Sequence, residues 1–131
     1  IQRAWKAFLE EPDVDSLRAV ELTKQHPGKM WVIHGRSMIP LLLQPTGAQP
    51  WHSQQYAVLP HVYVQNASLE IAWSRVIFEG ENISGKHIMP FVTKDLEGFD
   101  VNDERDWRDL ENLLENGKTL LPAVTVSPAP I

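Results

Sequence analysis

The sequence predicts an α/β fold, because segments with helical periodicity alternate with short segments typical of strands. Near the two ends, the stretches IQRAWKAFLEE and NDERDWRDLENLLENG place apolar side chains three or four positions apart. Between them lie short apolar runs, separated by turns that contain glycine or proline. The strands are too few for a complete nucleotide-binding sheet, and the sequence contains no glycine-rich phosphate loop.

Composition and charge narrow the classes of function. The chain has 131 residues, the length of one domain, with 43% hydrophobic and 22% charged residues. Its net charge is -5 and it has no run of basic residues, so we expect no nucleic-acid partner. No run approaches the ~20 apolar residues of a membrane-spanning helix, so we expect no membrane partner either. The sequence has no cysteine, which excludes disulfides and thiolate metal sites and is compatible with the cytoplasm.

The first two elements are predicted from the spacing of apolar residues. A helix is expected over residues 1–11, where the apolar side chains share one face, and Pro12 ends it. A strand follows over residues 16–23, where side chains alternate. The residues of this strand expected to share one side are Leu17, Ala19 and Glu21.

A hairpin and an extended loop come next. The stretch HPGK at residues 26–29 is a turn, and residues 30–33 and 38–43 form a hairpin around the turn HGRS. The polar loop at residues 44–55 contains two prolines, and its length indicates an excursion from the core that serves as a lid or a partner-binding arm. An ordinary surface loop is the alternative, with equal weight.

The stretch HVYVQNASLEIAW, residues 61–73, predicts a strand, a sharp break and a second strand. The polar residues of the break are Gln65, Asn66 and Ser68. A short helix is expected to begin at residue 74, and a turn that contains glycine follows it. Residues 86–92, KHIMPFV, form a further predicted strand with a proline near its end.

The last helix is predicted over about residues 102–116. Asn102 is the expected N-cap, acidic residues fill the first turn, and Gly117 ends the helix. The expected buried face comprises Val101, Trp107, Leu110, Leu113 and Leu114. The proline-rich tail at residues 118–131 is expected to be extended and to dock only through its two leucines.

Two candidate ligand contacts lie beside turns. Lys29 is a point charge suited to an anionic substrate, although a solvated turn lysine is the more common role for this residue type. Asn66 lies at the predicted break, where its amide can bond a ligand and the backbone together. The alternative for Asn66, with equal weight, is an Asx turn that only shapes the backbone.

Asp100 is the candidate metal ligand. It is expected at the C-terminal end of a short strand directly before a helix, the edge at which open α/β sheets bind ligands. Its carboxylate suits Mg²⁺, which prefers oxygen ligands and is often shared with substrate phosphates. Asn102 and Asp103 either help to bind the metal or serve as helix N-caps.

Four segments in this order resemble the acylneuraminate cytidylyltransferase family, whose members make CMP-sialic acids and related CMP-activated acid sugars. The segments are HPGKMW, LPHVYVQNASLEI, GKHIMPF and EGFDVNDERDW, and the resemblance runs over about residues 1–117. It implies a partial nucleotidyltransferase sheet of Rossmann-like type, with flanking helices and a protruding dimerisation arm. It also implies the family reaction, in which the anomeric hydroxyl of an acid sugar attacks the α-phosphate of CTP and pyrophosphate leaves, with Mg²⁺ as cofactor.

The site residues follow from the same resemblance. It makes Asp100 the catalytic residue and the first metal ligand, with Asn102 as the second ligand of a D-x-N pair. The substrate-binding residues that it implies are Lys29, Gln54, Gln55, Gln65, Asn66 and Glu70. The arm, at about residues 30–55, is expected to reach the neighbouring subunit's site, which implies a homodimer with CTP and an acid sugar as its ligands.

Departures from the family pattern concern the sugar. Where sialic-acid members carry an Arg-Gln pair, this chain reads SQQ at residues 53–55, and Arg36 is the candidate replacement for the lost arginine. Glu70 stands where those members have a tyrosine, and Ile83 and Ser84 replace an aromatic pair. These differences weigh against N-acetylneuraminate itself and keep open a different acid sugar or another nine-carbon analogue.

The loop rich in glycine, arginine and lysine that grips CTP in the family has no counterpart in residues 1–131. The chain therefore resembles the C-terminal half of the enzyme, and alone it is expected to bind no nucleotide tightly. Three hypotheses follow. The chain is one part of a cytidylyltransferase, or it is a non-catalytic remnant that keeps the dimerisation arm and a sugar-binding wall. The third is an α/β domain whose resemblance is coincidental, and four segments in the same order weigh against it.

Overall fold

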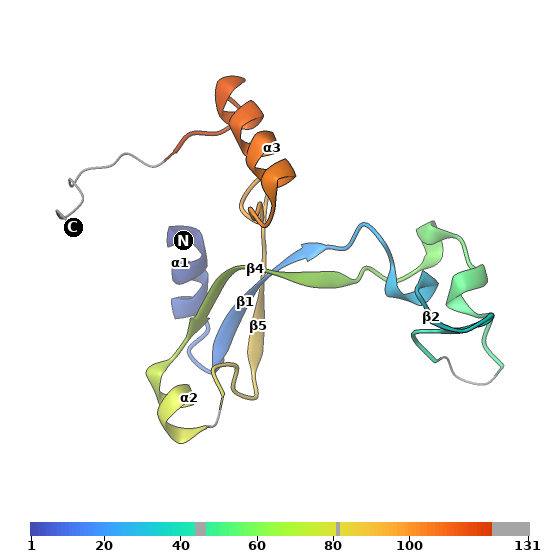
Figure 1. Cartoon of the computed structure of the whole chain (residues 1–131). Coiled ribbons are helices and arrows are strands. Elements are labelled where there is room, and N and C mark those ends of the chain that lie inside the picture. Colours follow the sequence, from blue (N-terminus) through green and yellow to red (C-terminus); the bar gives the residue numbers. More distant parts are fainter. Residues whose placement is uncertain (44–46, 81, 122–131) are drawn as a thin grey trace.

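The computed structural model describes residues 1–43, 47–80 and 82–121, and Figure 1 shows their arrangement. The α-helices in these ranges are α1 Gln2–Glu10, α2 Ser74–Glu79 and α3 Glu104–Glu115, and short 3-10 helices lie at Pro27–Lys29, Trp51–Ser53 and Tyr56–Val58. The strands are β1 Ser16–Leu22, β2 Trp31–His34, β3 Ser37–Pro40, β4 Tyr63–Ala72 and β5 Ile88–Val92. The predicted mixture of helices and strands is confirmed. Within the described ranges, no helix is long and apolar enough to cross a membrane.

The central sheet has three strands in the order β4-β1-β5. β1 runs antiparallel to β4 and parallel to β5, so that Leu17 lies between Ile71 and Met89. A Rossmann-like sheet needs several adjacent parallel strands, and the described residues supply one parallel pair. What the structure establishes is a small mixed sheet.

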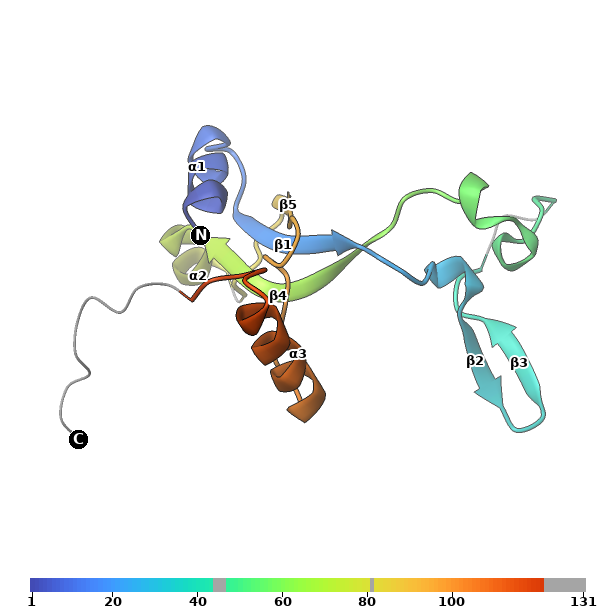
Figure 2. The same ribbon diagram turned by 90° about the horizontal axis from the view of Figure 1, so that it is seen from above.

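Helix α1 packs on one face of this sheet and forms the core with it (Figure 2). The buried core residues are Ala4 and Phe8 of α1, Leu17 and Ala19 of β1, and Phe91 of β5. Positions four apart lie on one side of a helix and alternate positions lie on one side of a strand, which explains these contacts. Phe8 also stacks on Trp73 with 4.7 Å between the ring centroids. Burial of such a side chain contributes about 2 kcal/mol.

Strands β2 and β3 form a separate hairpin that projects from the sheet together with residues 47–59 (Figures 1 and 2). We call this projection, β2, β3 and residues 47–59, the arm. Gly35 adopts φ +60 in the tight turn between His34 and Ser37, which are the last paired residues of the hairpin. The predicted hairpin is thus confirmed, with strand bounds shifted by one to three residues. Residues 44–46 of the predicted loop lie outside the described residues.

The N-cap of α3 is Asp103, so the prediction of Asn102 is wrong. The Asp103 carboxylate accepts hydrogen bonds from the backbone N–H groups of Arg105 at 2.8 Å and Asp106 at 3.0 Å. Asp106 in turn accepts from the N–H of Asp103 at 3.2 Å, which completes a reciprocal capping box. Gly117, at φ +62, ends the helix as predicted.

The apolar face predicted for α3 is buried only in part, because the helix stands away from the core of α1 and the sheet (Figure 1). Leu110, Leu113 and Leu114 are half-buried. Val101 is 41% exposed and Trp107 is 54% exposed. The leucines of the tail are also exposed, Leu120 by 87% and Leu121 by 68%, so the prediction that they dock is wrong. The rest of that predicted segment, residues 122–131, lies outside the described residues.

Candidate functional site

The predicted break between two strands is a bulge within one strand, β4. The pairing of β4 with β1 shifts at this point, because Arg18 lies opposite Glu70 whereas Val20 lies opposite Gln65. The four residues 66–69 therefore face a single residue of β1. The prediction of two separate strands is wrong because residues on both sides of the extra segment keep pairing with β1.

Polar side chains shape this bulge. The Oδ1 atom of Asn66 accepts hydrogen bonds from the backbone N–H of Ser68 at 3.3 Å and from its hydroxyl at 2.9 Å. Ala67 between them adopts φ 55, the left-handed conformation that the turn requires. The Asx turn considered for Asn66 is confirmed. It uses the oxygen of the Asn66 side-chain amide, so the nitrogen can donate to another residue.

One group of candidate residues meets on the sheet face turned away from α1. Arg18 points there because its neighbours in β1 pack on α1. The Arg18 guanidinium forms an ion pair with Glu70 and donates a hydrogen bond to the hydroxyl of Ser84 at 2.7 Å. Glu70 also accepts from Gln65 Nε2 at 2.8 Å, so two predicted site residues are joined directly.

Asn66 belongs to a second group, on the same face as α1. Its Nδ2 atom donates to Thr93 Oγ1 at 3.0 Å. Gly98 packs against this amide, since a Cβ atom added to Gly98 would lie 2.3 Å from Asn66 Nδ2 and 3.0 Å from Glu21 Oε2. The fold therefore places Asn66 beside the segment that leads to Asp100. A hollow next to this contact is lined by Ile1, Ser68, Leu69, Phe91, Thr93 and Glu97.

Asp100 lies in the connection between β5 and α3. The prediction that it directly follows a strand is wrong, because β5 ends at Val92 and residues 93–99 intervene. The predicted D-x-N pair is in contact, with Asn102 Nδ2 donating to Asp100 Oδ2 at 3.0 Å. Both residues are exposed.

Asp100 and Asn102 fit Mg²⁺ only as a partial set of ligands. Asn102 presents its amide nitrogen to Asp100, so the amide must rotate before its oxygen can face a cation. Mg²⁺ is commonly held by one or two carboxylates together with water and substrate phosphates, which a single Asp with a nucleotide satisfies. In the described part of the chain, no three His, Asp or Glu side chains gather into a metal site.

The remaining predicted residues, Lys29, Gln54 and Gln55, belong to the arm or its base, apart from the sheet (Figure 1). The Lys29 ammonium donates to the backbone carbonyls of His52 at 3.1 Å and Gln54 at 2.6 Å. Gln54 Nε2 donates to the carbonyl of Gln49 at 2.6 Å. These bonds brace the arm, so Lys29 has a structural role within one chain.

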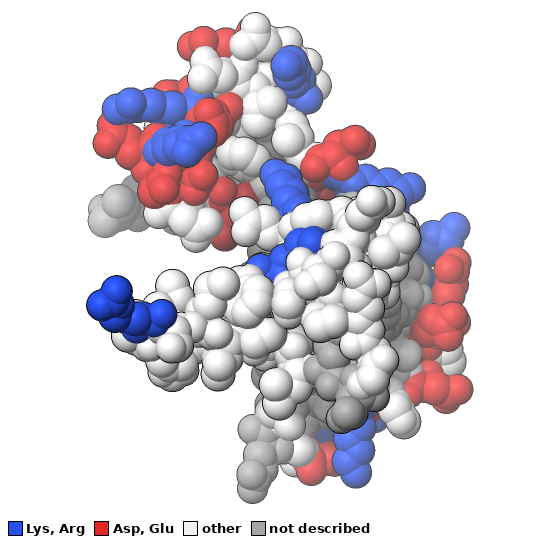
Figure 3. All heavy atoms as spheres, turned by 90° about the vertical axis from the view of Figure 1, so that its right-hand side faces the viewer, with Lys and Arg blue, Asp and Glu red and all other residues white. Residues whose placement is uncertain are grey.

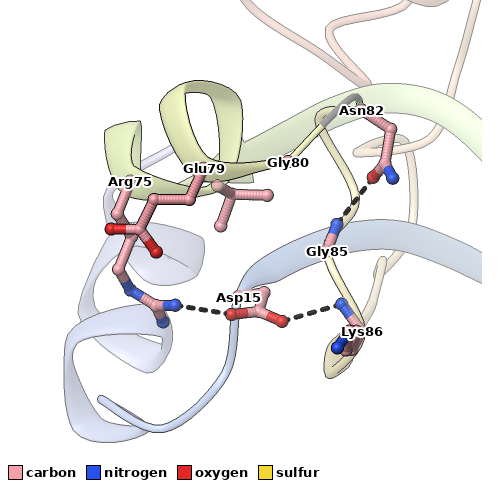
Figure 4. A pocket seen from close by; sticks show the side chains of 8 residues that line it. Asp15, Arg75, Glu79, Gly80, Asn82, Gly85 and Lys86 are labelled. Carbon is pink, nitrogen blue, oxygen red and sulfur yellow. Dashed lines mark hydrogen bonds and ion pairs between the residues drawn. The ribbon is translucent and has the colours of Figure 1, made fainter.

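A separate hollow lies between α2 and the turn before β5 (Figure 4). Asp15 is one of its lining residues. The Asp15 carboxylate accepts hydrogen bonds from Arg75 Nη1 at 2.7 Å and from the backbone N–H groups of Lys86 and His87. These donors, His87 first, lower the pKa of Asp15 to about 2. Asp15 therefore stabilises the turn as a carboxylate, and a carboxylate with so low a pKa does not serve as a general acid at neutral pH.

Sequence reasoning missed three residues that the fold adds to the predicted ones: Arg18, Glu21 and Thr93. Arg18 carried a detectable signal, because it is a charged residue within an apolar strand and needs a partner if buried. Glu21 and Thr93 could not be recognised from the sequence, because they reach Asn66 and Gly98 only when β1, β4 and the segment after β5 lie side by side.

No family model matches the chain, and no curated protein matches it. The arguments for function therefore come from the residues and their arrangement.

Proposed function

We propose that the protein is a cytidylyltransferase that activates an acid sugar with CTP, and that residues 1–131 supply its sugar-facing wall and its dimerisation arm. The observation that supports this best is the contact between Asn66 and Gly98. These residues come from two of the four segments that resemble the family, and they lie 32 positions apart in the sequence. Packing of the two segments against each other is what a common site requires.

The reaction joins the anomeric oxygen of the sugar to the α-phosphorus of CTP. The bond from that phosphorus to pyrophosphate breaks, and the hydroxyl proton passes to a base or to water. In the proposal, Asp100 binds Mg²⁺, with Asn102 beside it, and Gln65 faces the sugar with Glu70 behind it. Asn66, on the opposite face of the sheet, supports the segment that leads to Asp100. Bound Mg²⁺ would offset negative charge on the phosphates. The nucleotidyltransferase fold and a CTP site formed by residues beyond these 131 are part of the proposal.

The arm is proposed to join two copies of the protein. Figure 3 looks onto the arm and displays uncharged atoms over most of it. The exposed apolar residues of its hairpin are Val32, Ile33, Met38 and Ile39, with exposures from 38% to 73%. A projecting apolar hairpin of this kind favours burial against a partner, which here is a second copy. In such a dimer Lys29, Gln54 and Gln55 approach the neighbouring subunit's sugar wall.

The proposed partners are thus CTP, an acid sugar and a second subunit, and the proposed location is the cytoplasm, where CTP is available. The competing proposal is a remnant that only dimerises and binds sugar. It is supported by Lys29, whose ammonium donates to two backbone carbonyls of the arm and so stabilises the arm itself. Turnover separates the two, because the remnant would bind without making product.

Variants of Asp100 test the metal assignment in the full-length protein that carries these residues. Pyrophosphate release would be measured with CTP, Mg²⁺ and a panel of acid sugars. We expect Asp100→Ala to lower kcat/KM at least ~100-fold, because one carboxylate holds the metal, and Glu104→Gln, at an exposed ion pair on α3, to leave it unchanged. Unchanged turnover in Asp100→Ala would remove Asp100 from the site.

A further inference from the structure

Arg18 is a buried charge inside the sheet, although it touches no ligand in the proposed scheme. Only 8% of the residue is exposed, and it lies on the face away from the α1 core. A buried guanidinium is tolerated when its charge is paired and its donors are bonded. Arg18 meets this condition through the Glu70 carboxylate and the Ser84 hydroxyl.

The partner of Arg18 is bonded in turn to an exposed amide. Glu70 accepts from Arg18 with Oε2 and from Gln65 Nε2 with Oε1, the latter at 2.8 Å. The bulge makes this contact possible, because Gln65 and Glu70 are the last paired residues on its two sides. The result is a chain of contacts from a buried cation to a side chain at the surface.

The chemistry of Glu70 decides which way the Gln65 amide points. A carboxylate paired with a guanidinium, which is always protonated, only accepts hydrogen bonds. The NH₂ group of Gln65 must therefore face Glu70, and the carbonyl Oε1 must face away from it. Without the carboxylate, the two ends of an amide are nearly equivalent in shape and the group can flip.

We propose that Arg18 and Glu70 are positioning residues that fix Gln65 with its carbonyl oxygen outward, as an acceptor for one hydroxyl or amide N–H of the bound acid sugar. This inference rests on the proposed function, and it names the contact by which the wall selects its sugar. Gln65 is the group that touches the sugar, and the other two act through it. A site built to bond a particular hydroxyl discriminates against the analogue that lacks it.

The test compares one accepted acid sugar with its analogues that each lack one hydroxyl or the amide. It measures kcat/KM in the full-length protein for the wild type, Gln65→Ala, Glu70→Gln and Arg18→Met. We expect the wild type to lose roughly 10-fold with one of these analogues, the value of one hydrogen bond. Gln65→Ala and Glu70→Gln should use that analogue and the parent sugar equally well, because neither presents a fixed acceptor.

Controls keep a folding defect apart from a change in selection. Glu70→Gln preserves the shape of the side chain and an oxygen for Arg18, and its thermal unfolding is compared with that of the wild type. Glu104→Gln, in an exposed ion pair with Arg108, should keep the full discrimination. The side-chain amide NMR signals of Gln65 give a second readout, and we expect them to shift in Glu70→Gln and in Arg18→Met.

The outcomes separate the inference from the proposed function. Turnover with the wild-type pattern of discrimination in Glu70→Gln and Gln65→Ala would overturn the inference and leave the proposed function standing. Loss of turnover by the same factor for every analogue would also overturn it, since Gln65 would then hold no particular group. No turnover of any acid sugar by the wild type would overturn the proposed function and the inference with it.

Discussion

Arg75 of α2 donates a hydrogen bond to Asp15 at 2.7 Å, and the two residues are separated by 60 positions in the sequence. The second oxygen of Asp15 accepts from the backbone N–H groups of Lys86 at 2.7 Å and His87 at 3.1 Å. One carboxylate thus ties α2 and the turn before β5 to the start of β1. Gly85 belongs to this arrangement, because it has φ +70 and a Cβ atom there would lie 2.3 Å from Asp15.

Asp15 should make stability depend on pH in the acid range. Its pKa falls from 3.8 to about 2 in the folded state, chiefly through the N–H groups of His87 and Lys86. The unfolded chain therefore binds this proton at a higher pH, and the stabilisation present above about pH 4 is lost as the pH falls toward 2. We expect Asp15→Asn to lower the urea midpoint at pH 7 and to reduce its fall between pH 5 and pH 2.5.

Asp13→Asn is the matched control for this experiment, because Asp13 is exposed and lies two positions away. Part of the pH dependence should remain in Asp15→Asn, since Arg3 and the N–H of Lys94 also lower the pKa of Glu97. Equal pH profiles for the two variants would contradict the role given to Asp15.

Gly98 should be intolerant of a side chain. A Cβ atom at this position would lie 2.3 Å from Asn66 Nδ2 and 3.0 Å from Thr93 Oγ1, so Gly98→Ala must push the Asn66 amide away. We expect a loss of roughly 1–3 kcal/mol in the free energy of unfolding, measured with urea. If the clash with Asn66 is the cause, the double variant Asn66→Ala/Gly98→Ala will be more stable than the sum of the single variants predicts. Additive losses would place the defect elsewhere.

The hairpin of the arm should control association. Ile33 and Met38 are paired across β2 and β3 and are 73% and 56% exposed. Replacing both with glutamate would place charges in the proposed apolar interface, and we expect the dimer dissociation constant to rise at least ~10-fold. Sedimentation equilibrium measures this, with Glu115→Lys on α3 as a control. A dimer of unchanged affinity would exclude the hairpin from the interface.

The start of α3 gives a test of the corrected N-cap. Asp103→Ala removes a carboxylate that accepts from the N–H groups of Arg105 and Asp106. Loss of such a cap costs about 1 kcal/mol, so the amides of the first turn should exchange with solvent roughly fivefold faster. Asn102→Ala should leave this exchange rate as it is, because Asn102 donates its side-chain bond to Asp100 and caps nothing. Hydrogen exchange measured by NMR distinguishes the two.

The elements that follow from local spacing were predictable. Ala4 and Phe8 have the spacing of one helix face, and Leu17 and Ala19 have the spacing of one strand face. These patterns predict the first helix and the first strand correctly, because the same four residues form the core. Sequence alone did not separate Asn102 from Asp103 as the N-cap, because both are good capping residues. The hydrogen bond that the Asp103 N–H donates back to the Asp106 carboxylate favours Asp103.

The arrangement of the candidate site depends on long-range pairing, which local patterns do not contain. Gln65 and Asn66 are neighbours in one strand, so their side chains point to opposite faces of the sheet, to Glu70 and to Thr93. The contact between Gln65 and Glu70, five positions apart, depends on the bulge and so on the register of β4 on β1, which local patterns do not contain. Likewise, the apolar side of α3 predicts a buried helix, but burial requires a surface for it to pack on.

The most direct test of the central claim is product formation. The full-length protein that carries residues 1–131 would be incubated with CTP, Mg²⁺ and a panel of nine-carbon and eight-carbon acid sugars, and the mixture analysed by mass spectrometry. We predict a CMP-sugar and pyrophosphate in equal amounts from at least one sugar, and neither when Mg²⁺ is chelated. The absence of any CMP-sugar across the panel, from folded protein, would contradict the proposed function.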